Sequence, residues 1–153
     1  MARNRRPPRD PVNAALSYGY AVLRGVVEAA VVSAGLHTEI GVLHSTTRRN
    51  PALVLDLMEE FRVPVVDRAV GRLFGRGELK PHKHFGGGSQ KTLLNKSGKG
   101  VLIEGIEFQL QSERKHPLSG RVTTLMQHIY GQARMLEGAI VRGKAYEPFW
   151  IAD

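Results

Sequence analysis

Three side chains in the first half of the sequence are of the types that hold a divalent cation. His44 stands twelve residues before Asp56 and fifteen before Glu59. Asp56 and Glu59 are three residues apart, and side chains at that spacing are neighbours on a helix surface. One imidazole and two carboxylates, with positions left for water and substrate, could serve a metal that activates a hydroxyl for attack on a phosphodiester. On spacing alone, a solvated acidic face beside an ordinary histidine is the commoner explanation, because single motifs of this kind often mislead.

The helix that must carry the two acids is marked by a stripe of apolar residues. The stripe follows the i, i+3, i+4, i+7 rule and consists of Val54, Leu57, Met58, Phe61 and Val65. At about 100° per residue, Asp56, Glu59 and Glu60 fall on the opposite, solvated side. Asn50 as a cap and Pro51 in the first turn predict where the helix starts. Pro64 predicts a kink near Arg62, because proline removes a backbone donor and crowds the preceding turn.

Three more helices are predicted, and together they make the fold class mainly α. They cover about residues 12–34, 104–115 and 122–142, the last closed by Gly143. The stretch from 86 to 103 is rich in glycine and lysine, which indicates a small β-hairpin or a flexible loop, with "SGKG" as a turn. Residues 1–12 are rich in arginine and proline and are expected to form a basic arm or linker. Residues 13–153 are then a single multi-helix domain.

The charge balance favours a polyanionic partner. The sequence has 22 lysines and arginines against 14 acids, a formal charge of +8, and such a bias favours phosphate neutralisation. Nucleic acid is therefore the first partner to test. The candidate phosphate contacts are Arg48, Arg49, Arg62, Lys80 and Lys83, which would position a duplex without reading its sequence. Plain solvation of these side chains is the alternative.

The remaining histidines show no pattern typical of a catalytic site. His82 and His84 lie in a lysine-containing loop, where phosphate contact or solvation is expected. His116 and His128 have no acidic neighbour in the sequence. The chain has no cysteine, which excludes disulfides and thiolate chemistry.

The apolar segments predict no membrane span. The longest of them is interrupted by Arg24 and Glu28. The basic start is not followed by the apolar core of a signal peptide. A cytoplasmic protein is the expectation.

Five stretches in order resemble one known family. They are "RNRRPPRDPVNAALSYGYAVLRG", "AGLHTEIGVLH", "PALVLDLMEEFR", "GELKPHKHF" and "HPLSGRVTTLMQHIYGQARMLEGAIVRGKAYEPF". In sequence and spacing they resemble the helical C-terminal domain of the CRISPR-associated spacer-acquisition integrase, over nearly the whole chain.

The resemblance implies a DNA-joining and DNA-cleaving domain that uses Mg²⁺ or Mn²⁺. It implies that His44 of "GVLH" and Glu59 of "DLME" are metal ligands, and that Asp56 supports the site in proton transfer or metal binding. The partners it implies are double-stranded DNA, a small ferredoxin-like adaptation protein and, in some members, a RecB-like exonuclease.

One family ligand has no counterpart in this sequence. The family's first glutamate lies in an "EG-x-AAR"-like helix ahead of "RRPPRDPVNA", after an N-terminal β-domain used for dimerisation, and this sequence starts almost at "RRPPRDPVNA". Glu28 does not match that ligand's position. We therefore expect a truncated or split integrase that acts as a homodimer or with a complementing N-terminal half. The alternatives are a non-catalytic nucleic-acid-binding or assembly module and a structural fragment that associates through exposed helices.

Overall fold

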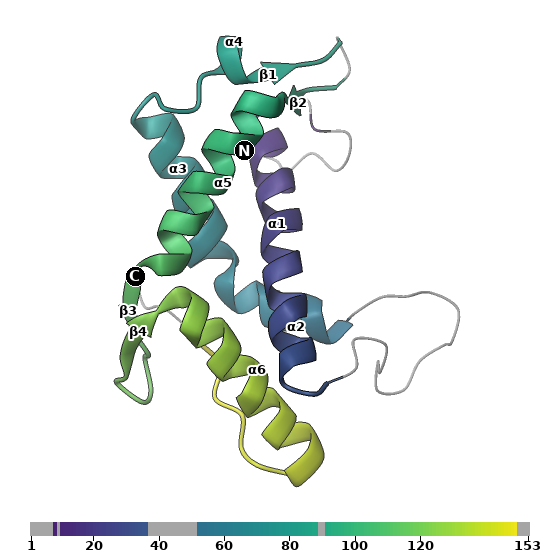
Figure 1. The fold of residues 1–153 in the computed structure, drawn as a ribbon, viewed down its shortest axis with the longest axis vertical. Helices are drawn as coiled ribbons and strands as arrows, with labels where there is room; N and C mark the ends of the chain where they lie inside the picture. The colour runs from purple at the N-terminus through teal and green to yellow at the C-terminus, as the bar shows by residue number, and fades with distance from the viewer. Residues whose placement is uncertain (1–7, 9, 37–51, 89–90, 150–153) are drawn as a thin grey trace, which may run out of the picture.

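The computed structural model describes residues 8, 10–36, 52–88 and 91–149, and the fold within them is mainly α, as predicted (Figure 1). The helices are α1 (Pro11–Ser33), α2 (Ala52–Phe61), the π-helical η1 (Arg62–Asp67), α3 (Arg68–Gly75), α4 (Pro81–His84), α5 (Lys96–Gln111) and α6 (Leu125–Arg142). Two antiparallel pairs join β1 (Phe85–Gly86) to β2 (Leu93–Leu94) and β3 (Glu113–Lys115) to β4 (Val122–Thr124). One hydrophobic core joins these elements, with α1 in contact with α2, η1, α5 and α6.

Helix α1 begins at Pro11, so the last two residues of the predicted arm are helical. The Asp10 carboxylate caps it by accepting hydrogen bonds from the Asn13 backbone N–H at 2.9 Å and from Asn13 Nδ2 at 2.6 Å. These bonds, the backbone one first, lower the pKa of Asp10. A proline at the first position suits the helix, since its missing N–H would be unpaired there anyway.

The length and composition of α1 would also allow it to cross a membrane, in contrast to the expectation from its two charged residues. The central helix of a hydrophobic core has the same character. Its stripe of Leu23, Val27, Ala30 and Val31 is buried, and this face packs within the core. Close packing is also visible at Gly19, where an added Cβ would lie 2.6 Å from Val66 Cγ1 of η1.

The predicted change in the second helix occurs at Arg62, where α2 passes into η1. Pro64 lies inside this π-helical segment and is buried. A π-turn widens the backbone spacing locally, which accommodates a residue that lacks an N–H. The chain therefore continues from α2 through η1 into α3 without a break in the helical structure.

The hairpin predicted after residue 86 is present, but it is shorter than predicted. Phe85 pairs with Leu94 and Gly86 with Leu93, whereas "SGKG" lies in the first turns of α5, so its interpretation as a turn was wrong. Asn95 caps this helix by accepting from the Gly98 N–H at 2.8 Å. Gly98 is needed for close packing, because a Cβ there would lie 2.4 Å from the His84 carbonyl oxygen.

The predicted 104–115 helix was wrong at both ends, because α5 begins at Lys96 and ends at Gln111, where β3 follows. Glu113, Arg114 and Lys115 pair with Thr124, Thr123 and Val122. Helix α6 then starts behind the Thr124 cap and ends at Gly143, whose φ of 63° is the left-handed value that favours glycine. Beyond Gly143 the chain turns back and runs beside α6 (Figure 1).

Candidate metal centre

The structure places Asp56 and Glu59 together on the exposed face of α2. Both residues are exposed, while Val54, Leu57 and Phe61 on the other face are buried in the core. The predicted amphipathic helix is therefore confirmed. Carboxylates one turn apart on a helix are neighbours on its surface, so the two can offer oxygen donors side by side.

The third member of the predicted set lies outside the described residues. His44 falls there, and so do the candidate DNA contacts Arg48 and Arg49 and the predicted cap Asn50. Among the residues that the structure does describe, no three histidine, aspartate or glutamate side chains gather closely enough to hold a metal ion. The complete ligand set remains a prediction.

Arg62 is held in place beside Glu59. Its Nη1 donates to Glu59 Oε1 at 2.5 Å, and its guanidinium carbon lies 4.1 Å from the centre of the Tyr20 ring. The Arg62 side chain is 15 % exposed, against 60 % for Glu59. Burial opposes the guanidinium charge, but the hydrogen bond and charge of Glu59 outweigh it and raise the pKa of Arg62. Arg62, predicted as a DNA contact, thus also orients the carboxylate predicted to bind metal.

Tyr20 of α1, which lies under the Arg62 guanidinium, also contacts Asp67 of η1. Its hydroxyl donates to Asp67 Oδ1 at 2.5 Å. Burial, followed by this hydrogen bond and the Asp67 charge, raises the pKa of Tyr20. No local sequence pattern could have predicted this contact, because Tyr20 and Asp67 are 47 positions apart.

Lys80 and Lys83 lie far from the acidic pair. They are exposed around α4, which lies at the top of the molecule in Figure 1, well above α2. His84, the last residue of α4, is buried. Its Nδ1 accepts a hydrogen bond from the Lys80 backbone N–H at 2.9 Å. The predicted phosphate contact or solvation of His84 was wrong, because the side chain is buried and its carbonyl oxygen and Cβ lie against Gly98 at the start of α5.

Glu60 does not lie on the solvated face predicted for it. Its carboxylate accepts hydrogen bonds from the Tyr146 hydroxyl at 2.5 Å, from Gln132 Nε2 at 3.0 Å and from the Phe149 backbone N–H at 2.8 Å. Burial and the Glu60 bond raise the pKa of Tyr146. The segment after Gly143 supplies two of the three donors, so no local periodicity could have predicted this environment.

His116 and His128 are buried around the same C-terminal segment. Their rings lie 5.4 Å and 4.8 Å from the Phe149 ring, which stacks on Phe61 at 5.0 Å. His116 Nδ1 accepts from two backbone N–H groups, so its Nε2 carries the proton and donates to Gln132 Oε1 at 3.2 Å. These contacts are structural, and we call the set of Glu60, Gln132, Tyr146 and Phe149 the C-terminal clasp.

The sequence was compared with protein-family models and with curated proteins, and both comparisons point to the same family. A family model described as "CRISPR associated protein Cas1" matches residues 1–107. "CRISPR-associated endonuclease Cas1 1" of Thermus thermophilus is 51% identical over 150 residues, covering 97% of this chain and 47% of that protein, in its C-terminal part. A "CRISPR-associated exonuclease Cas4/endonuclease Cas1 fusion" of Rhodospirillum rubrum is 39% identical over 88% of this chain and 23% of its own.

Solved structures show the same fold. A "Casposase bound to integration product" gives a TM-score of 0.80 at 27% identity over 94% of this chain and 41% of its own. "TM1797, a CAS1 protein from Thermotoga maritima" gives 0.78 at 30% identity over 91% and 42%. A chain of a "Cas6-RT-Cas1--Cas2 complex" gives 0.75 at 29% identity over 99% and 16%. The chain spans about half, or less, of the curated relatives it matches.

Proposed function

The chain belongs to the CRISPR associated protein Cas1 family, and on that premise we propose that it is the DNA-binding catalytic part of a metal-dependent CRISPR integrase and endonuclease. The reaction is phosphodiester cleavage and transesterification that inserts spacer DNA into a repeat array. The observation that supports it most directly is the exposed Asp56 and Glu59 pair, with Glu59 held by Arg62 on a helix whose other face is buried.

His44, Glu59 and Asp56 are the residues that would hold Mg²⁺ or Mn²⁺. The described donors fit such an ion, because carboxylate oxygens are the ligands that hard divalent cations prefer. When bound, the ion supplies Lewis-acid stabilisation of the phosphate charge and a lowered pKa for the attacking hydroxyl. Arg62 donates a hydrogen bond to Oε1 of Glu59, and it would hold that carboxylate in place for the ion.

The chain's own residues contribute orientation and phosphate binding. The Tyr20 ring and the Arg62 guanidinium fix one rotamer of Glu59, which reduces the reorganisation that metal binding requires. Arg48 and Arg49 follow His44 closely in the sequence and are assigned to the phosphates nearest the reaction. Lys80 and Lys83, at the distant α4, are assigned to DNA farther along the duplex.

The partners proposed are double-stranded DNA, a second copy or a complementing N-terminal half, a small ferredoxin-like adaptation protein and a RecB-like exonuclease. Among the structural neighbours, one is described as part of a complex with Cas2. One relative is described as a fusion with the exonuclease Cas4. These descriptions belong to the other proteins and support the partner classes proposed for this one.

The function is tested by supplying the N-terminal half of the Thermus relative to the purified chain. With labelled duplex DNA and Mn²⁺, we expect nicking or strand joining only when both parts are present. His44→Ala and Glu59→Gln should each lower the rate by at least about 100-fold, because even outer partners of metal ligands typically contribute about 10–100-fold. Glu104→Gln, an exposed acid on α5, is the matched control and should retain the rate.

Two outcomes would contradict the proposal. Unchanged activity in His44→Ala would show that the metal site is wrongly assigned. Salt-sensitive DNA binding that is indifferent to EDTA and to Glu59→Gln, without any cleavage or joining, would instead favour a non-catalytic DNA-binding module.

A further inference from the structure

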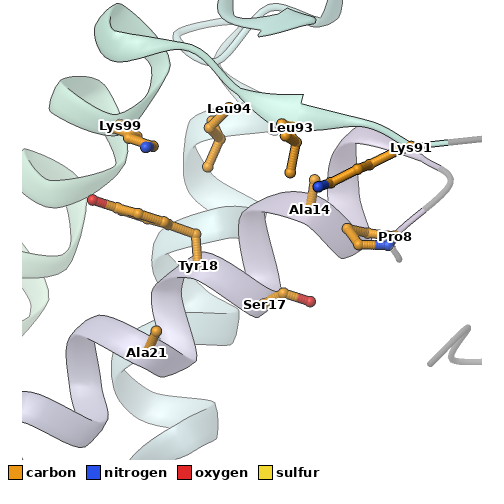
Figure 2. A pocket seen from close by; sticks show the side chains of 9 residues that line it. All are labelled: Pro8, Ala14, Ser17, Tyr18, Ala21, Lys91, Leu93, Leu94 and Lys99. Atoms are coloured by element: carbon orange, nitrogen blue, oxygen red, sulfur yellow. The ribbon is translucent and has the colours of Figure 1, made fainter. Parts of the chain in front are cut away.

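A pocket of about 540 Å³ opens between the first turns of α1 and the strand β2 (Figure 2). Tyr18 and Ala14 of α1 form one wall, while Leu93 and Leu94 of β2 point toward them from the other. Lys91 and Lys99 stand at its two ends. Small-molecule and cofactor sites have volumes of roughly 300–1,000 Å³, so the space is sufficient for a ligand of that class.

The polar groups at the pocket select for an anion. Of the nine described residues that line it, two are lysines and none is acidic. Lys99 Nζ lies 5.4 Å from the centre of the Tyr18 ring. An ammonium on a flexible stem over an aromatic face can move to a phosphate when a ligand takes its place on the ring.

The apolar groups at the pocket select for a flat ring. Tyr18 is half-buried, and Leu93 is 46 % exposed although it is a large aliphatic side chain at the edge of the groove. A tyrosine ring that lines a basic recess is a surface on which nucleobases stack in proteins that bind single strands. A duplex has its bases paired and stacked inside, so it could offer only phosphates to this recess.

We propose that this pocket holds one unpaired nucleotide of a DNA strand, with its base against the Tyr18 ring and its flanking phosphates on Lys91 and Lys99. The choice of DNA rests on the proposed function, but the site does not use the metal. None of its lining residues comes from α2 or η1. Tyr18 and Tyr20 leave α1 roughly 200° apart, so the pocket and the Arg62 contact lie on different sides of that helix.

The test measures binding of a fluorescent oligo-dT strand by anisotropy in EDTA, which removes any contribution from a metal site. Tyr18→Ala should weaken binding roughly ten-fold, since one base stacked on an aromatic side chain is typically worth about 1–3 kcal/mol. Tyr18→Phe keeps the ring and should bind within about two-fold of the wild type. Tyr130→Ala removes another half-buried tyrosine, on α6, and is the control; thermal denaturation verifies that each variant is folded.

Contact is tested by ultraviolet cross-linking of a strand that carries one iodouracil, followed by mass spectrometry. We expect the adduct on the peptide that contains Tyr18. An adduct only elsewhere, or equal binding by Tyr18→Ala and the wild type, would overturn the proposal. Displacement of the strand by a poly-glutamate peptide of equal charge would also overturn it, because it would show that charge alone suffices.

The two proposals fail in distinguishable ways. If the chain binds duplex DNA but not the single strand, the pocket assignment falls and the proposed function stands. If single-strand binding depends on Tyr18 while the reconstituted protein shows no metal-dependent cleavage or joining, the pocket stands and the catalytic function falls.

Discussion

Glu59 and Glu60 are sequence neighbours with identical side chains, and the fold gives them opposite environments. Glu59 is 60 % exposed and bonded to Arg62, one turn along the same helix. Glu60 turns into the C-terminal clasp, where three donors from distant parts of the chain meet its two oxygens. A step of one residue rotates a side chain by about 100°, which is enough to pass from a solvated face to a packed one. The first position is the one proposed to bind the metal ion, and the second ties α2 to the C-terminal segment.

The largest difference in stability between the buried clasp and the exposed acidic face is expected for a substitution at Phe149. Its ring is fully buried and stacks on Phe61, so Phe149→Ala should lower the free energy of unfolding by about 3–5 kcal/mol. Asp56→Ala on the exposed face should change it by no more than about 0.5 kcal/mol. Urea unfolding followed by circular dichroism measures both. Equal values for the two variants would show that the clasp is not part of the cooperative core.

A smaller but more specific effect is expected at the two glutamates. Glu60→Gln places an amide donor against groups that are donors themselves, which should cost about 1–3 kcal/mol. Glu59→Gln should cost at most about 1 kcal/mol, because exposed ion pairs contribute little. The order should reverse for activity, where Glu59→Gln should lower the rate of the proposed metal-dependent reaction by at least about 100-fold. A Glu60→Gln variant with wild-type unfolding would contradict the role of the clasp.

The smallest expected effect is the pH dependence of folding stability that comes from His128, which packs against Phe149 of the clasp. Burial lowers the pKa of His128, so the folded protein binds a proton here less readily than the unfolded chain does. Stability from this group is present above the unfolded pKa of about 6.5 and is lost as the pH falls toward the lower folded value. The melting temperature should therefore decrease below about pH 6.5, and it should decrease less in His128→Asn. A His128→Asn variant with the same acid sensitivity as the wild type would assign the effect to other groups.

Local patterns predicted the elements that bury a continuous stripe. The helix of Asp56 and Glu59, the bend at Arg62 and the stop at Gly143 follow from periodicity, proline and glycine alone. The prediction of a turn at "SGKG" failed, because Gly98 lies in a helix and its lack of a side chain leaves room for the His84 carbonyl oxygen. Prediction also failed for Glu60 and His84, whose partners belong to other elements.

By itself, the sequence determined the helical class, the exposed acidic pair and, through five ordered stretches, the family. These depend on spacing within a single segment or on order along the chain, and both can be read without coordinates. The tertiary structure alone decided that Arg62 lies on Tyr20, that the C-terminal segment closes on Glu60, and that Tyr18 and Leu93 line the same pocket. Each of these joins residues that are tens of positions apart, and only the packing of helices around the core brings such residues within contact distance.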